Sequence, residues 1–177
     1  MKMLASRGIC AAALAFVSLF SAVAHAHSSS NAYLTISVDS HDSLLHAQWD
    51  VALRDLEFVL GINAKGDGKL TWGELLNRKA AISRYVYSHL NLSAEGSVCT
   101  IEPRSMQVDD HADGAYAALF FDFRCGSKLP AGVSLDYTLF FDIDPTHRGI
   151  FVLHNGPLVS TALFAPEKGH IQLPLKP

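Results

Sequence analysis

The sequence is short of positive charge. Its 177 residues include 14 lysine and arginine residues against 17 aspartate and glutamate residues. Without residues 1–26, which have the features of a leader, 12 basic and 17 acidic side chains remain, a formal charge of −5. Nucleic-acid-binding domains are typically basic, so we expect no nucleic-acid partner.

Long apolar runs are also absent after residue 26, where none reaches the roughly 20 residues that a membrane-spanning helix needs. The leader begins with Lys2 and Arg7, continues with the apolar run "GICAAALAFVSLFSAV" and ends in small residues up to Ala26. This order is typical of a secretory signal peptide. We therefore predict a cleaved signal at 1–26 and a single mature domain at 27–177, periplasmic or secreted and without a membrane span.

Cysteine is scarce, with three residues in the whole chain. Cys10 leaves with the predicted signal, so Cys99 and Cys125 remain as a pair in a chain sent to a compartment that permits disulfides. We predict a disulfide between them, and its loop of about 25 residues would contribute roughly 3 kcal/mol on the chain-entropy model. The alternative is a pair of thiolate metal ligands, but neither cysteine has a nearby partner cysteine or histidine in the sequence.

Common catalytic motifs are missing. The sequence contains no Gly-x-Ser-x-Gly, no phosphate-binding loop and no His-Glu-x-x-His. Neither remaining cysteine has the sequence setting of a free reactive thiol. We therefore predict that the protein is not an enzyme.

Apolar and polar residues alternate with a period of two through much of the chain, as in β-strands with one buried face. The longer stretches are 32–39, 44–53, 115–125 and 133–143, and shorter ones follow near 149–155, 158–165 and 170–175. Turn residues separate these stretches at short intervals. We predict a mainly β fold, an immunoglobulin-like β-sandwich of two sheets, in which the first two stretches form a hairpin.

The period changes to three and four residues in the middle of the chain. Apolar residues recur at helical spacing after about residue 55, and again from Leu75 through Ile82 and Val86 to Leu90. We predict a helix–loop–helix insert at about 55–91, between the second and third strands of the sandwich.

The loop of this insert, "NAKGDGKLTWGE" at 63–74, has the spacing of a calcium-binding EF-hand loop. Gly68 stands at the sixth position, where the chain must turn sharply, and Leu70 stands at the usual apolar position. The predicted calcium ligands are Asn63, Asp67, the carbonyl group of Lys69, Thr71 and Glu74.

One residue of this loop opposes calcium. Lys65 occupies the third position, where a ligand oxygen is expected, and an ammonium group about 5 Å from a dication costs on the order of several kcal/mol. We therefore expect weak calcium binding, with a dissociation constant of roughly 0.1 to 1 mM. The alternative is a metal-free turn in which Asn63 and Asp67 cap the helix ends.

Two other stretches place carboxylates beside a histidine, "DDHADG" at 109–114 and "DIDPTHRG" at 142–149. Zinc, copper and nickel favour such groups. If the two stretches meet in space, the second-choice metal ligands are Asp109, Asp110, His111, Asp142, Asp144 and His147. The alternative is two ordinary acidic turns with exposed histidines, because Asp-Gly and Asp-Pro commonly form turns.

The predicted mature N terminus is a further metal candidate. If His27 is the first residue, its amine and imidazole can chelate copper. If the signal is instead cut after Ala24, His25 is first and His27 is third, an arrangement that binds Cu(II) or Ni(II) in a square plane.

Four stretches together resemble a known family: "AHAHSSSNAYLTI", "AQWDVALRDLEFVLGINAKGDGKLTWGEL", "DDHADGAYA" and "LFFDIDPTHRG", which run in this order from about 25 to 155. The chain is similar to the extracytoplasmic N-terminal domain of bacterial HupE/UreJ-type membrane proteins. The loop in that family is usually more acidic, and Asn63 and Lys65 depart from it.

The resemblance implies an exported domain followed by a bundle of membrane helices. The family is associated by name with nickel supply. The chain ends at "LPLKP" without that bundle, so transport is not carried over. We predict an exported, non-enzymatic binding or accessory module with a degenerate calcium loop, whose partner is an inner-membrane protein. The alternatives are a copper or nickel metallochaperone that uses His27, and a metal-free structural interaction domain.

Overall fold

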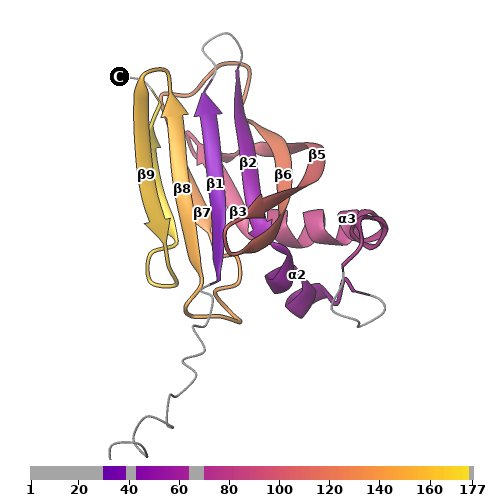
Figure 1. Ribbon diagram of the computed structural model, residues 1–177. Helices are drawn as coiled ribbons and strands as arrows, with labels where there is room; N and C mark the ends of the chain where they lie inside the picture. The colour runs from indigo at the N-terminus through magenta and orange to yellow at the C-terminus, as the bar shows by residue number, and fades with distance from the viewer. Residues whose placement is uncertain (1–29, 39–42, 64–69, 176–177) are drawn as a thin grey trace, which may run out of the picture.

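Two β-sheets form most of the computed structural model, which describes residues 30–38, 43–63 and 70–175 (Figure 1). In chain order the elements are β1 (Asn31–Val38), β2 (Leu44–Ala52), α2 (Leu53–Leu60), α3 (Trp72–Ser88), β3 (Leu90–Ala94), β4 (Ser97–Val98), β5 (Thr100–His111), β6 (Gly114–Arg124), β7 (Gly132–Tyr137), β8 (Arg148–Asn155), β9 (Leu158–Phe164) and β10 (His170–Pro174). One sheet has six strands in the order β5-β6-β2-β1-β8-β9, and the other has four in the order β10-β7-β3-β4. The predicted mainly β class with two sheets is confirmed.

The two sheets share one apolar core. Alternate residues of β1, namely Ala32, Leu34 and Ile36, are buried, because successive side chains of a strand point to opposite faces. The rings of Trp49 in one sheet and Tyr137 in the other lie 5.4 Å apart between centroids. One face of the six-stranded sheet thus covers the core. Its outer face carries the polar side chains of β2 and β5.

Strand β1 pairs antiparallel with β2, as the predicted hairpin requires, and parallel with β8 on its other side. The parallel pairing brings the 138–147 connection beside the start of β1. Gly149 at the start of β8 is next to the Tyr137 ring, and a Cβ atom there would lie 2.6 Å from a ring carbon. Glycine at this position therefore makes room for the buried tyrosine.

Helices α2 and α3 lie between β2 and β3 in the chain, within the stretch where helical spacing begins. Helix α2 ends at Gly61, whose φ of 54° is left-handed and whose N–H donates to the Glu57 carbonyl oxygen at 2.9 Å. Helix α3 begins after Thr71 and buries the stripe Leu75, Ile82 and Val86. That stripe follows helical periodicity and packs α3 on the core.

One strand prediction is wrong and one strand was missed. The stretch 133–143 does not form one long strand, because β7 ends at Tyr137. The chain then turns, with Phe140 at a φ of 60°, and buries the adjacent residues Leu139 and Phe140. Adjacent buried residues cannot share one face of a strand. Strand β5 was not predicted at all, since most of its residues are exposed and it contains Pro103.

The predicted disulfide is confirmed. The sulfur atoms of Cys99 and Cys125 lie 2.03 Å apart, and their Cα atoms 4.3 Å apart. The adjacent residues Thr100 and Arg124 are the first pair of the β5–β6 ladder. The disulfide therefore closes the base of the hairpin whose tip carries His111.

No helix in the described ranges is long and apolar enough to cross a membrane.

Candidate metal centre

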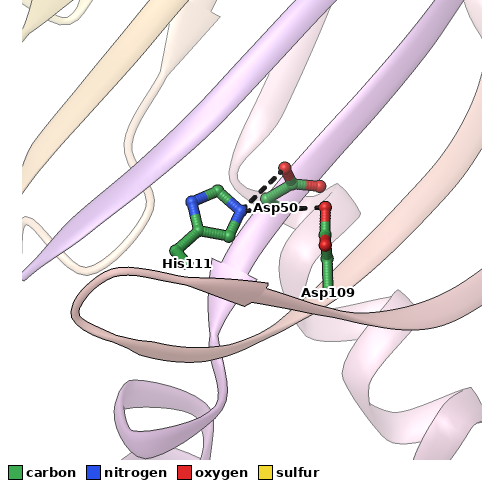
Figure 2. Close-up of side chains that lie close together, drawn as sticks. All are labelled: Asp50, Asp109 and His111. Atoms are coloured by element: carbon green, nitrogen blue, oxygen red, sulfur yellow. Dashed lines mark ion pairs between the residues drawn. The ribbon is translucent and has the colours of Figure 1, made fainter.

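Three side chains that can ligate a metal converge on the outer face of the six-stranded sheet. Figure 2 shows one ring nitrogen of His111 facing the carboxylates of Asp50 and Asp109. His111 Nε2 lies 3.3 Å from Asp50 Oδ2 and 4.0 Å from Asp109 Oδ2. One ligand atom from each residue lies within 4.8 Å of the other two. Within the described part of the chain, this is the one such group of three histidine, cysteine or acidic residues.

The strand register explains why these residues meet. Asp109 and His111 are two residues apart on β5, so they share a face. Asp50 lies on β2 opposite Ala118 of β6, the strand between β2 and β5. On the other side of β6, Asp109 lies opposite Tyr116 and His111 lies opposite Gly114, whereas Gln107 is the residue opposite Ala118. Asp50 therefore meets Asp109 and His111 diagonally across β6.

Aromatic rings hold the imidazole in place. The His111 ring lies 4.1 Å from the Tyr116 ring and 4.9 Å from the Tyr33 ring, measured between centroids. The Tyr116 hydroxyl donates to the Asp113 carboxylate at 2.9 Å, which fixes that ring in turn. The histidine is thus positioned by packing before any ion binds.

Asp50 is the most buried of the three ligands, at 7% exposure. Burial raises its pKa above the ordinary value and the neighbouring Asp109 raises it further, while the hydrogen bond from Gln48 and the charge of His111 lower it. Gln48 Nε2 donates to Asp50 Oδ1 at 2.9 Å, whereas Oδ2 is the oxygen nearest His111. A cation at this point would offset the cost of keeping a carboxylate out of water.

The site opens to solvent through a depression of about 690 Å³. Its walls include Asn31, Tyr33 and the hairpin tip from Asp109 to Asp113. An ion could therefore reach His111 and Asp109 without any opening of the core.

The six second-choice ligands do not meet at one site. Asp109 and His111 lie in the group just described, and the backbone N–H of Asp110 donates to Asp109 Oδ1 at 2.9 Å. Asp142, Asp144 and His147 belong instead to the connection between β7 and β8. Asp144 accepts hydrogen bonds from the Thr146 N–H and hydroxyl at 2.7 and 2.6 Å, and these bonds lower its pKa. Asp144 therefore stabilises a turn through its side chain, as the alternative of an ordinary acidic turn predicts.

His147 is a fully buried part of a hydrogen-bonded chain. Ser30 Oγ donates to Asp55 Oδ2 at 2.8 Å and also lies 2.5 Å from His147 Nδ1, while His147 Nε2 lies 2.7 Å from the Tyr137 hydroxyl. Since the serine proton points to Asp55, Nδ1 of a neutral His147 must donate to Ser30, and Nε2 must accept from Tyr137. Both nitrogens are therefore occupied.

The environment of His147 also lowers its basicity. Burial reduces its pKa from 6.5 to about 4, with Asp144 acting in the opposite direction and Arg148 adding to the decrease. A serine, a histidine and an aspartate thus lie together, but Ser30 donates its proton to Asp55 instead of to the histidine. The arrangement differs from a nucleophile triad, in which histidine accepts the serine proton.

The predicted calcium loop is described only at its ends. The Asn63 N–H donates to Glu57 Oε2 at 2.5 Å. Thr71 and Glu74 form a capping box at the start of α3, in which Glu74 Oε2 accepts from the Thr71 N–H at 2.9 Å and from its hydroxyl at 2.7 Å. Asp67 and Lys69, like His27 at the predicted N terminus, lie outside the described residues.

Asp50 was missed by sequence reasoning. Its signal was present: an aspartate on the polar face of a predicted strand, although aspartate is depleted in strands. Only the pairing of β2, β6 and β5 shows that it faces the hairpin tip.

No protein-family model matches this chain, and no curated protein matches it.

Proposed function

We propose that this protein is an exported, non-enzymatic accessory module that binds a first-row divalent metal ion through Asp50, Asp109 and His111. The ligand set, one imidazole and two carboxylates, suits zinc and its neighbours in the series. Three protein ligands leave a fourth position open toward the depression, as in zinc sites that bind an exchangeable ligand.

The spacing of the three ligands is the observation that carries the proposal. Two other histidine–aspartate pairs in the chain are in direct hydrogen-bond contact, His46–Asp122 at 2.7 Å and His170–Asp136 at 2.6 Å. The corresponding distances at His111 are 3.3 and 4.0 Å. Ligands about 2.1 Å from a tetrahedral ion lie roughly 3.4 Å from one another. The two distances at His111 bracket this separation, so one ion could lie between the three groups, and the longer His111–Asp50 contact is a weaker hydrogen bond than those of the other two pairs.

Zinc titration calorimetry on the metal-stripped protein tests this assignment. We expect saturable binding with one ion per chain, weakened at least tenfold by Asp109→Asn and by His111→Ala, because each change removes a ligand. The matched controls are Asp110→Asn, the neighbouring acid, and His170→Ala, which breaks an ordinary histidine–aspartate pair. Both should bind zinc as the parent does.

Two results would count against the site. Absence of zinc binding in the parent would refute it, and so would an equal loss of affinity in His170→Ala. Binding that vanishes with His27→Ala but survives His111→Ala would instead support the alternative of a metallochaperone with an N-terminal copper or nickel site.

Calcium binding by the 63–74 loop remains a second candidate. The positions of the helices support it: α2 ends at Leu60, three residues before Asn63, and α3 begins directly after Thr71, the ninth position of the motif. Leu70, the apolar eighth position, packs against the core. These features support an EF-hand-like insert, in which Glu74 would have to leave the capping box that it forms here.

Glu74→Gln separates capping from calcium binding. Glutamine also completes a capping box, so the helix should keep its cap while the loop loses a charged ligand. We expect calcium heat in the parent that saturates at roughly 0.1 to 1 mM and disappears in the variant. No heat in either protein would favour the metal-free structural domain, and equal heat in both would mean that calcium binds without Glu74.

The Cys99–Cys125 disulfide supports export, since such bonds persist in oxidising compartments. The two-sheet core is compatible with an immunoglobulin-like sandwich. With the HupE/UreJ-like stretches, these features favour an accessory role beside an inner-membrane protein.

A further inference from the structure

Three of the four sheet edges carry features that prevent pairing with another strand. The β5 edge contains Pro103, a register shift between Pro103 and Ser105, and several charged side chains. The β4 edge is two residues long, and the five-residue β10 ends at Pro174. Prolines, bulges, charges and short length are the usual protections of an exposed edge.

Strand β9, at the outer end of the six-stranded sheet, has none of these protections (Figure 1). Its sequence "LVSTALF" has no charge, no proline and no glycine, and its ladder with β8 runs without a register shift. Leu158, Val159 and Leu163 are 56%, 59% and 49% exposed. The first four residues are all exposed, so neither face of this half of the strand is covered.

We propose that β9 pairs antiparallel with β9 of a second copy of this chain, joining the two six-stranded sheets across a two-fold axis. With Thr161 on the axis, Val159 lies opposite Leu163 of the partner subunit, and Ser160 lies opposite Ala162 of the partner subunit. The apolar exposed side chains thus meet one another, and the strand is self-complementary as a two-fold interface requires.

Charge does not oppose a second copy at this edge. The chain carries a formal charge of −3, so two copies repel each other overall, and an interface between them needs an uncharged surface. The β9 edge is uncharged along its whole length, and a two-fold axis there places no like charges opposite one another. Cross-strand pairs of leucine and β-branched residues fit a pleated, half-exposed surface.

Sedimentation equilibrium with a chelator present tests this pairing independently of the metal site. We expect a concentration-dependent dimer in the parent and at least a tenfold weaker dimer in Val159→Lys. The matched control is Val108→Lys on the opposite edge strand β5, where the replaced side chain is 43% exposed. It should dimerise as the parent does.

Cysteine cross-linking tests the register. In a Cys10→Ser background, Thr161→Cys should give a covalent dimer on mild oxidation, because the two-fold axis places this position opposite itself. Val159→Cys should not, since its own counterpart lies several residues away along the strand. A parent that stays monomeric at all concentrations, an equal effect of Val108→Lys, or equal cross-linking at both positions would overturn the proposal.

Discussion

Acidification from pH 7 to pH 4 is expected to lower the free energy of unfolding by about 3 kcal/mol through His147 alone. Burial holds the pKa of this imidazole at about 4 in the folded protein, against 6.5 for a free histidine. Its neutral ring uses both nitrogens, toward Ser30 and Tyr137. A proton on Nε2 would turn the acceptor of the Tyr137 bond into a second donor and place a charge in the core.

The sign of the effect follows from proton binding. Between pH 6.5 and about 4 the unfolded chain binds a proton at His147 that the folded chain does not, so the stabilisation is complete above pH 6.5 and is lost as the pH falls. Asp50 and Asp55 act in the opposite sense, because burial raises their pKa values. They offset part of the loss at the acid end of this range, whereas Asp144, with its lowered pKa, adds to it in stronger acid.

Urea denaturation of the parent and of His147→Gln at pH 7, 5.5 and 4.5 isolates the histidine. Glutamine retains an amide donor and acceptor but does not titrate, so the variant should start less stable and lose less stability on acidification. His154→Gln, an exposed position on β8, should follow the parent curve. If His147→Gln loses as much stability with acid as the parent, other groups cause the acid sensitivity.

The strands that sequence reasoning found are those with one buried face. In β1 and β2 the alternation is regular, so the predicted and observed elements nearly coincide. Strand β5 lies at the sheet edge, where most of its side chains meet water, and its sequence therefore carries little alternation of apolar residues. The 138–143 segment alternates by coincidence, because the chain turns there, burying the adjacent Leu139 and Phe140 while Ile143 is exposed.

The candidate site divides in a similar way. Asp109 and His111 were predictable because carboxylates stand beside a histidine in "DDHADG", although the strand that places both on one face was not predicted. Asp50 was not, since its place beside them depends on strand order, which local patterns do not encode. His147 was predicted as a second-choice metal ligand because it stands near aspartates in the sequence. It is instead a buried hydrogen-bonding residue, and its burial could not be judged from the turn residues around it.

Replacing both Cys99 and Cys125 by serine is expected to lower the free energy of unfolding by about 3 kcal/mol, because the disulfide restricts a loop of about 25 residues in the unfolded chain. The loss should be concentrated in the β5–β6 hairpin, whose base the disulfide closes. Strand β5 is an edge strand with few buried residues, so its pairing has little other support.

Two measurements separate the cross-link from side-chain effects. On denaturation, the double serine and double alanine variants should both show the loss of the cross-link, with a somewhat larger loss for serine because Cys99 is buried and a hydroxyl group there would be buried too. Hydrogen exchange should become faster in β5 than in β1, which pairs with a strand on each side. A loss below about 1 kcal/mol would mean that hairpin contacts alone hold the unit together. Because Asp109 and His111 lie at the tip of this hairpin, a loosened base should also weaken zinc binding, which ties the stability of the fold to the proposed site.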